Sequence, residues 1–229
     1  MSEPDKRRSI RSFVRREGRM TPAQTRSLKQ LWPLYGIPVG DAPLDWPTVF
    51  VRRAPVILEI GFGNGEALAA VAVEHPENNY LGIEVHRPGA GSLLRLLEAG
   101  KLSNVRIMLA DAKEVLDAQI PDASLTAVHL FFPDPWPKRR HHKRRLVQPD
   151  FAALTVRKLI PGGYFHLATD WQDYAEHMAA VLSRTPGLAD VSGSVRFSAL
   201  ATSRRQTRFE QRGRRLGHAV RDLVFQRAD

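Results

Sequence analysis

Short apolar runs alternate with helical patterns along most of this chain, and this alternation constrains the fold more than any other feature of the sequence. Five runs have the length and composition of buried strands, at residues 55–61, 79–85, 104–111, 125–132 and 163–170. Helical patterns lie between and after them, near residues 65–76, 91–99, 112–118, 149–159 and 171–184. Strands that alternate with helices are joined by right-handed crossovers, so we expect a mostly parallel sheet with both faces covered.

The last part of the chain departs from this alternation. Two strand-like runs, "DVSGSVRFS" (190–198) and "HAVRDLVFQR" (218–227), are joined by polar, Arg-rich residues with no crossover helix. Strands joined without a crossover pair as an antiparallel hairpin. The predicted fold is therefore α/β and Rossmann-like, with a mostly parallel seven-stranded sheet and a C-terminal antiparallel hairpin. This order is similar to that of class I methyltransferases.

Three regions are expected along the chain. Residues 1–30 contain many Lys and Arg residues and few large apolar ones, which favours a flexible basic arm. A Pro-rich connector follows at residues 31–54, and residues 55–229 form the α/β domain. A chain of 229 residues suits one such domain with appendages and is short for two.

The charge balance indicates a polyanionic partner. The chain has 34 Lys and Arg residues against 24 Asp and Glu residues, which gives a formal net charge of +10. Nucleic acid is the first candidate, because the basic blocks lack the Trp, Phe and Leu face of a helix that lies on a membrane. No apolar segment approaches the length of a membrane span, which favours a soluble, cytoplasmic protein.

No metal is expected. The sequence has no cysteine, which excludes disulfides and thiolate metal sites. The adjacent residues His141 and His142 have no third ligand at a plausible spacing, so they make a poor metal site.

The stretch "LEIGFGNGE" (58–66) places three glycines where the first strand turns into a helix. Gly61, Gly63 and Gly65 would let the backbone and a helix N-terminus approach a ligand closely. Such turns also occur where a chain only needs to reverse, so the glycines alone are weak evidence for a cofactor.

Acids at the carboxyl ends of successive strands strengthen the prediction of a cofactor site. Glu59 ends the first strand, Glu84 the second and Asp111 the third. Glu84 has the spacing at which an acid accepts hydrogen bonds from both ribose hydroxyls, which disfavours NADP and leaves NAD and S-adenosylmethionine. Glu59 favours S-adenosylmethionine, because an acid beside the turn would repel a diphosphate and suits ammonium and sulfonium groups. Asp111 has an alternative role as a helix cap before "AKEVL".

A single acid, Asp134, lies in a stiff loop after the fourth strand. In "HLFFPDPWPKRRHHKRR" (129–145), Pro133 and Pro135 fix φ on both sides of this acid and remove backbone donors. Trp136 offers a large face on which a base could stack, and its alternative role is to pack under its own loop.

A run of cations follows this loop. The run consists of Lys138, Arg139, Arg140, Lys143, Arg144 and Arg145, with His141 and His142 among them. Most such runs are solvated helix faces. In this fold the fourth strand adjoins the first, so the loop of Asp134 is expected to lie over the reactive carbon of the cofactor. Because the run adjoins this centre, and further basic blocks lie in residues 1–30 and 203–215, we predict an RNA track.

Together these segments resemble the bacterial tRNA (guanine-N7)-methyltransferase family. The resemblance is carried by "RSFVRREGRMTPAQ" (11–24), "LEIGFGNG", "GIEVHRPG" (82–89), "HLFFPDPWPKRRHHKRR", "ATDW" (168–171) and "TRFEQRGRRLGH" (207–218). It covers nearly the whole chain, and the segments around "FFPDPWPK" and "RFEQRGRRLGH" are far more specific than the Gly-rich turn.

The resemblance implies contacts to both substrates. Contacts to S-adenosylmethionine are implied at Glu59, Glu84, Asp111 and Asp134. Contacts to tRNA are implied at Lys138, Asp170, Thr207, Arg208, Phe209 and Glu210. The implied reaction is methylation of N7 of the variable-loop guanine of tRNA, position 46. Arg208 departs from the Lys that the family usually has, which keeps the charge and changes the geometry of the donors.

The chemistry of guanine agrees with this implication. N7 has an exposed lone pair and no proton, so its attack on a sulfonium methyl group needs no general base. Orientation and electrostatics must then supply the acceleration. Asp134 is the predicted catalytic residue, because its charge opposes the cost of the positive charge that forms on the ring. Asp170 is expected to accept hydrogen bonds from the base edge, with capping of the next helix as the alternative.

Two other functions stay open from the sequence alone. One is a methyltransferase of the same fold that acts on another RNA. The other is a non-catalytic RNA-binding module on a Rossmann scaffold, since a fold does not fix a function. The series of acids argues against the second, because a module that only binds RNA has no need of it.

Overall fold

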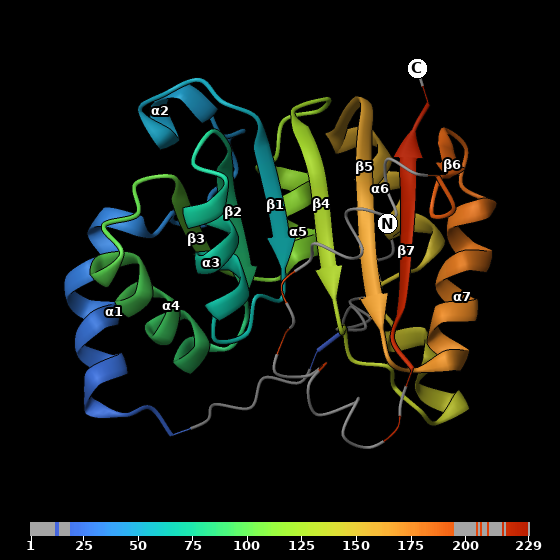
Figure 1. The fold of residues 1–229 in the computed structure, drawn as a ribbon, viewed down its shortest axis with the longest axis horizontal. Coiled ribbons are helices and arrows are strands. Elements are labelled where there is room, and N and C mark those ends of the chain that lie inside the picture. Colours follow the sequence, from blue (N-terminus) through green and yellow to red (C-terminus); the bar gives the residue numbers. More distant parts are fainter. Residues whose placement is uncertain are drawn as a thin grey trace, which may run out of the picture.

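The computed structural model describes residues 12–13, 19–194, 205, 207, 210, 217 and 219–228, and its centre is a seven-stranded sheet (Figure 1). The strands are β1 (Val56–Ile60), β2 (Asn79–Glu84), β3 (Val105–Leu109), β4 (Leu125–Phe131), β5 (Leu159–Thr169), β6 (Leu188–Asp190) and β7 (Arg221–Arg227). Their order is β3-β2-β1-β4-β5-β7-β6. β1 to β5 pair in parallel, whereas β7 is antiparallel to both β5 and β6. The predicted fold class, with its C-terminal antiparallel strands, is confirmed.

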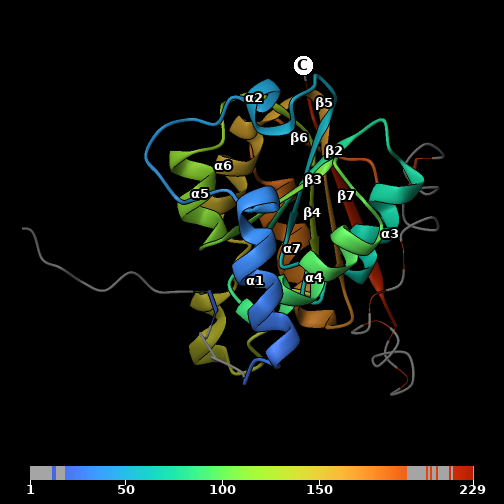
Figure 2. The same ribbon diagram turned by 90° about the vertical axis from the view of Figure 1, so that its left-hand side faces the viewer.

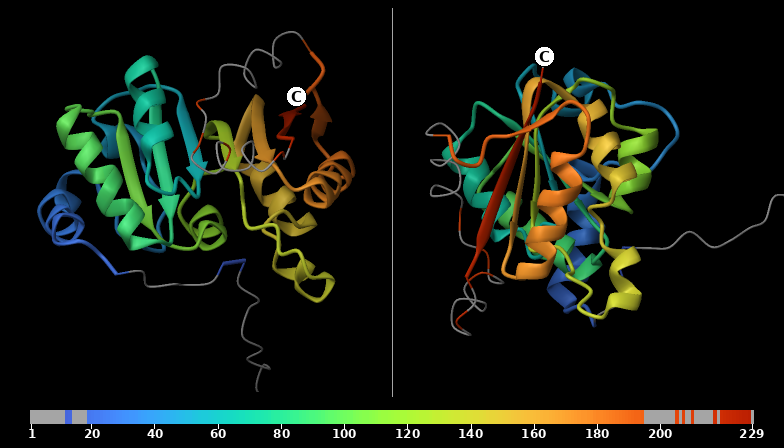
Figure 3. Two further views of the ribbon diagram at one scale, coloured as in Figure 1. Left: turned by 60° about the horizontal axis from the view of Figure 1, so that its bottom comes forward. Right: turned by 90° about the vertical axis from the view of Figure 1, so that its right-hand side faces the viewer.

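Helices cover both faces of the sheet (Figures 1 and 2). They are α1 (Pro22–Tyr35), α2 (Trp46–Phe50), α3 (Glu66–Glu74), α4 (Arg87–Ala99), α5 (Ala112–Ala118), the 3-10 helix η1 (Arg139–Arg144), α6 (Pro149–Lys158) and α7 (Gln172–Ser183). One buried apolar layer joins the sheet to α1, α3 and α4. A second layer joins the opposite face to α5, α6 and α7, and α7 contacts both β5 and β7 (Figure 3).

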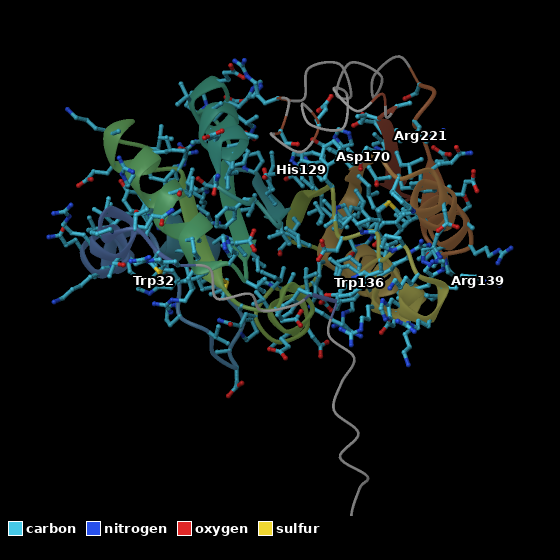
Figure 4. All side chains as sticks on the ribbon, turned by 90° about the horizontal axis from the view of Figure 1, so that it is seen from below. Trp32, His129, Trp136, Arg139, Asp170 and Arg221 are labelled. Carbon is cyan, nitrogen blue, oxygen red and sulfur yellow. The ribbon has the colours of Figure 1, made fainter. Side chains whose placement is uncertain are left out.

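The parallel strands end together at one edge of the sheet, the lower edge in Figure 1. β1 pairs with β2 on one side and with β4 on the other, so the strand order reverses at β1. In an open α/β sheet a ligand binds outside the carboxyl ends of the strands at such a switch point. Figure 4 looks onto this edge, where Trp136 and Asp170 lie.

Part of the predicted flexible arm, residues 1–30, is helical instead. Residues 22–30 belong to α1, which also crosses the predicted boundary with the connector 31–54. Thr21 and Gln24 form a capping box at the start of this helix, and Pro22 stands at its first position. The prediction was wrong here because the many basic residues masked this start signal; residues 1–11 and 14–18 lie outside the described residues.

Helix α1 packs closely on α4. Leu28 and Leu31 are buried in the layer that α4 shares. A side chain at Gly91 of α4 would meet the carbonyl oxygen of Gln24 at 2.9 Å, so the two helices approach at a position that needs glycine. The helix is therefore part of the domain and not a detached arm.

The first strand of the predicted hairpin is also displaced. Strand β6 covers only Leu188–Asp190, whereas the run 190–198 was expected to be extended. Residues 192–194 form a turn in which the backbone N–H of Ser192 donates to the Asp190 carboxylate at 2.9 Å. Ser and Gly favour such a turn over a strand. Residues 195–198 lie outside the described residues.

We expect Leu31→Ala to destabilise the protein and Leu34→Ala to leave its stability nearly unchanged. Leu31 is 7% exposed and Leu34 is 64% exposed, although both lie on α1. Truncation of a buried leucine costs about 2 to 5 kcal/mol of unfolding free energy. Urea unfolding of the two variants measures this difference. Equal midpoints would show that α1 is not packed on the domain.

Candidate active site

A cavity of about 300 Å³ opens at the carboxyl edge of the sheet, around the ends of β1, β2 and β4 and the start of α5. Its lining includes most of the residues expected to bind a cofactor: Gly61, Gly63, Glu84, Asp111 and Asp134. The fold thus brings together residues from Gly61 to Asp134 that are far apart in the sequence.

The three glycines of the turn after β1 have different roles. Gly61 and Gly63 have φ angles of +77° and +58°, and a Cβ atom built on either meets nothing within 4 Å. Side chains there would be strained and would project into open space at the cavity, so glycine leaves the backbone accessible from the cavity. A Cβ atom on Gly65 would instead meet Leu93 at 2.6 Å. Gly65 therefore serves the packing of α3 on α4, and the other two glycines fit a cofactor cradle.

Glu84 holds the backbone around this cradle. Its Oε2 accepts a hydrogen bond from the backbone N–H of Gly63 at 2.9 Å. Its Oε1 accepts from the N–H groups of Val85 and His86 at 2.7 and 3.0 Å. A carboxylate has about four acceptor positions, so about one position is left for a ribose hydroxyl donor. The same side chain thus orders the turn and faces the cavity.

Asp111 has both of the roles considered from the sequence. It is the N-cap of α5, and its Oδ1 accepts from the backbone N–H of Lys113 at 2.9 Å. It also lines the cavity. Capping fixes the position of its carboxylate, because the cap residue is held by the first turn of the helix.

Glu59 does not line this cavity. It is buried and lines a neighbouring cavity of about 180 Å³, together with Tyr80, His129 and His166. Side chains alternate between the two faces of a strand, so Glu59 points to the side opposite Leu58 and Ile60. Phe131 lines both cavities, which places Glu59 next to the cofactor cradle but behind this ring.

The loop that carries Asp134 has an unusual backbone on both sides of the acid. Phe132 has a φ angle of +53° and Trp136 of +46°, a region that side chains other than glycine rarely adopt. The N–H of Phe132 donates to the Ala168 carbonyl at 2.7 Å, which ties the end of β4 to β5. Asp134 itself is exposed at the cavity.

Trp136 packs within the protein. Its indole N–H donates to the Ser12 carbonyl at 3.0 Å, and the Arg144 guanidinium lies 5.1 Å from the centre of its ring. The His141 ring meets it edge-on at 5.8 Å. Of the two roles considered for this residue, these contacts favour packing under its own loop.

The cationic run divides into exposed and buried members. Lys138, Arg139, Arg140 and Lys143 are exposed along η1 and its start. Arg145 is buried, with 1% of its side chain exposed, so its assignment to an RNA track is wrong. This difference was not visible in the sequence, because Arg145 ends a run of similar residues.

The expected tRNA-contacting residues lie partly within the described chain. Asp170 follows β5 at the same edge as Asp134, and the N-cap of α7 is Trp171, so Asp170 is not the cap. Glu210 is buried, and its backbone N–H donates to the Thr207 hydroxyl at 3.1 Å. Arg208 and Phe209 lie outside the described residues.

Ser12 and Phe13 line the cavity but were not predicted as site residues. They lie in the region assigned to the flexible arm, and they were overlooked because that region is rich in Lys and Arg. The segment "RSFVRREGRMTPAQ" that carries the family resemblance contains both, and this was the available signal.

The described residues contain neither a metal-binding cluster nor a membrane-spanning helix. No group of three or more His, Cys, Asp and Glu side chains there is arranged to hold a metal ion. No helix in the same part of the chain has the length and apolar character to cross a membrane.

Comparisons with known proteins identify relatives over almost the full length. Residues 53–223 match a family model described as "Putative methyltransferase". A tRNA (guanine-N(7)-)-methyltransferase from Alkalilimnicola ehrlichii is 58% identical over 225 residues, covering 97% of this chain and 94% of the relative. The protein of the same name from Hydrogenovibrio crunogenus is 54% identical over 224 residues, covering 98% and 93%.

A solved structure shares the fold. It is a variant of the 16S rRNA (adenine(1408)-N(1))-methyltransferase from Catenulisporales acidiphilia, with the cosubstrate S-adenosylmethionine. The TM-score is 0.52 at 13% identity, over 81% of this chain and 92% of the other. At this identity the likeness shows a common fold.

We expect Glu84→Gln to weaken S-adenosylmethionine binding about tenfold, because it removes charge-assisted acceptors worth about 1.5 to 3 kcal/mol. The matched control is Glu77→Gln, an exposed acid between α3 and β2 at the opposite edge of the sheet. Calorimetric titration with S-adenosylmethionine measures both affinities. Equal, unchanged affinities in folded proteins would remove Glu84 from the cofactor site.

Proposed function

Because this chain belongs to the tRNA (guanine-N7)-methyltransferase family, we propose that it transfers a methyl group from S-adenosylmethionine to N7 of a guanine in tRNA. The target that we propose is the variable-loop guanine at position 46. One observation carries the proposal: the Gly-rich turn, Glu84 and Asp134 line a single cavity at the switch point of the sheet.

The proposed cofactor contacts follow from the cavity lining. The backbone at Gly61 and Gly63 can approach the methionine part of the cofactor closely, since no side chain intervenes. Glu84 can accept from one ribose hydroxyl while it keeps its three hydrogen bonds to the backbone. Asp111, fixed as a helix cap, supplies a further acceptor at the cavity. Glu59 would act from behind Phe131, through its charge.

The cofactor supplies an electrophilic methyl group on a sulfonium, and the protein supplies orientation and charge. N7 of guanine has a lone pair and no proton, so no side chain has to remove a proton before attack. The ring becomes positively charged as the methyl group transfers. Asp134 lies in the cofactor cavity on a strained and stiff loop, so its carboxylate is positioned to stabilise this charge.

The tRNA contacts are proposed at the same edge. Asp170 accepts from the base edge, for which N1–H and the exocyclic amine of guanine are donors. Lys138 contacts the RNA at the start of the exposed run. Further contacts are proposed at Thr207, Arg208, Phe209 and Glu210. A rival function is methylation of another RNA by the same site, and a second is RNA binding without catalysis.

One experiment distinguishes these functions. The protein is incubated with labelled S-adenosylmethionine and bulk tRNA, and the tRNA is digested to nucleosides. We expect label in 7-methylguanosine and none in a tRNA that lacks the variable-loop guanine. Label in another nucleoside, or only in ribosomal RNA, would support the rival methyltransferase. Cofactor and RNA binding without any product would support the non-catalytic module.

We expect Asp134→Asn to lower kcat by about 10² to 10³, because it removes one preorganised charge while it keeps the shape of the side chain. The affinity for tRNA should hold or rise, since a negative charge leaves a site for a polyanion. Single-turnover rates and tRNA dissociation constants test this. A near-normal rate would contradict the electrostatic role, and a slow rate caused only by weak tRNA binding would make Asp134 a recognition residue.

We expect the double variant Arg139→Ala, Arg140→Ala to reduce the slope of log K against log salt for tRNA binding by about one to two. The matched control, Arg53→Ala with Arg184→Ala, removes two exposed charges at the opposite edge, before β1 and after α7. Equal slopes in the two double variants would show that the η1 cations are only solvated.

A further inference from the structure

The loop of residues 133–137 receives a hydrogen bond from a side chain outside it. The Nε of Arg145 donates to the carbonyl oxygen of Pro135 at 3.0 Å. This carbonyl belongs to the residue directly after Asp134. Three of the five loop residues are prolines, which have no backbone N–H, so the loop has few amides with which to fix itself. The Arg145 side chain therefore supplies a hydrogen-bond donor that the loop itself lacks.

Arg145 is in turn fixed by α7. Its Nη2 donates to the Asp173 carboxylate, and its guanidinium lies 4.8 Å from the centre of the Tyr174 ring. The hydrogen bond from Arg145 lowers the pKa of Asp173 below its usual range. With 1% of its side chain exposed, Arg145 is not available to RNA phosphates.

This arrangement connects the two acids that the proposed reaction uses. Asp134 lies in the loop after β4, and α7 begins two residues after Asp170. Figure 4 shows Trp136 of that loop and Asp170 at the same edge of the molecule. Arg145 bridges the loop and the first turn of α7, so it sets the position of one acid relative to the other.

We propose that Arg145 is a positioning residue, which fixes the Asp134 carboxylate over the cofactor cavity through its hydrogen bond to the Pro135 carbonyl. This inference rests on the proposed function. It assigns Arg145 no contact with cofactor or tRNA. The positive φ angles of Phe132 and Trp136 support it, because such conformations persist only where surrounding contacts fix them.

Two substitutions isolate this hydrogen bond. In Arg145→Gln the Nε2 amide stands the same number of bonds from the backbone as Nε of arginine, so it can donate to the Pro135 carbonyl. In Arg145→Met that position is a methyl group. Both variants lose the charge and the ion pair to Asp173, so they differ chiefly in the donor.

We expect Arg145→Met to lower kcat about tenfold or more, since small displacements of catalytic groups have effects of this size. Arg145→Gln should retain kcat within about threefold of the wild type, by the same reasoning. The tRNA dissociation constant should change little in either variant. Hydrogen exchange at the Asp134 and Trp136 amides should be faster in Arg145→Met than in Arg145→Gln, whether or not the substrate has been identified correctly.

Controls distinguish a loss of positioning from a loss of tRNA binding and from an error in the proposed function. Arg184→Gln, at an exposed position after α7 and at the opposite edge of the sheet, should leave both kcat and the tRNA dissociation constant unchanged. Equal kcat values in Arg145→Gln and Arg145→Met would overturn the proposal, as would a loss that appears only in tRNA affinity. Formation of 7-methylguanosine by the wild-type protein tests the proposed function separately.

A further variant tests the proposal if Arg145→Met does not fold. If Arg145→Met does not melt cooperatively, Arg145→Lys replaces it, because lysine keeps the charge and has a carbon at the Nε position. We expect its kcat to fall like that of Arg145→Met, while the Asp173 pair is retained. A kcat for Arg145→Lys equal to that of Arg145→Gln would overturn the proposal.

Discussion

The parallel pairing of β1 with β4 is the constraint on which the site depends. Leu130 of β4 lies opposite Ile60 of β1, so the Gly-rich turn after β1 and the loop after β4 leave the sheet side by side. β2 pairs on the other side of β1 and brings Glu84 to the same turn. A strand order without this reversal would separate the cradle from the acid, whatever their sequences.

The cationic side chains at this edge differ in burial. The exposed cations of η1 can neutralise phosphates, whereas Arg145, in the same run, makes its contacts inside the protein. Asp134 lines the cavity, whereas the exposed cations lie along η1. In the proposed reaction, this one edge would both attract the polyanion and stabilise the cation that forms on the base.

The fold was predictable from the sequence because its signals are periodic and local. Each parallel strand and its crossover helix were found to within a few residues, and the acids at the strand ends followed from them. The period of two along β1 also places Glu59 on the face away from Ile60, so its position outside the cavity of Glu84 and Asp134 was predictable as well. Helix α1 was missed because composition outweighed its capping box. The burial of Arg145 was not predictable, since it depends on Asp173 and Tyr174, which only the tertiary fold brings near.

The backbone around Asp134 indicates what this loop does. Left-handed φ angles at two residues other than glycine cost about 1 kcal/mol or more each, and glycine would relieve both. A loop that only connected β4 to η1 would need neither these conformations nor three prolines. Contacts from β5, from Arg145 and from the Ser12 carbonyl fix them instead. The strain is thus offset by contacts from three separate parts of the chain, and what they jointly fix is the position of one carboxylate.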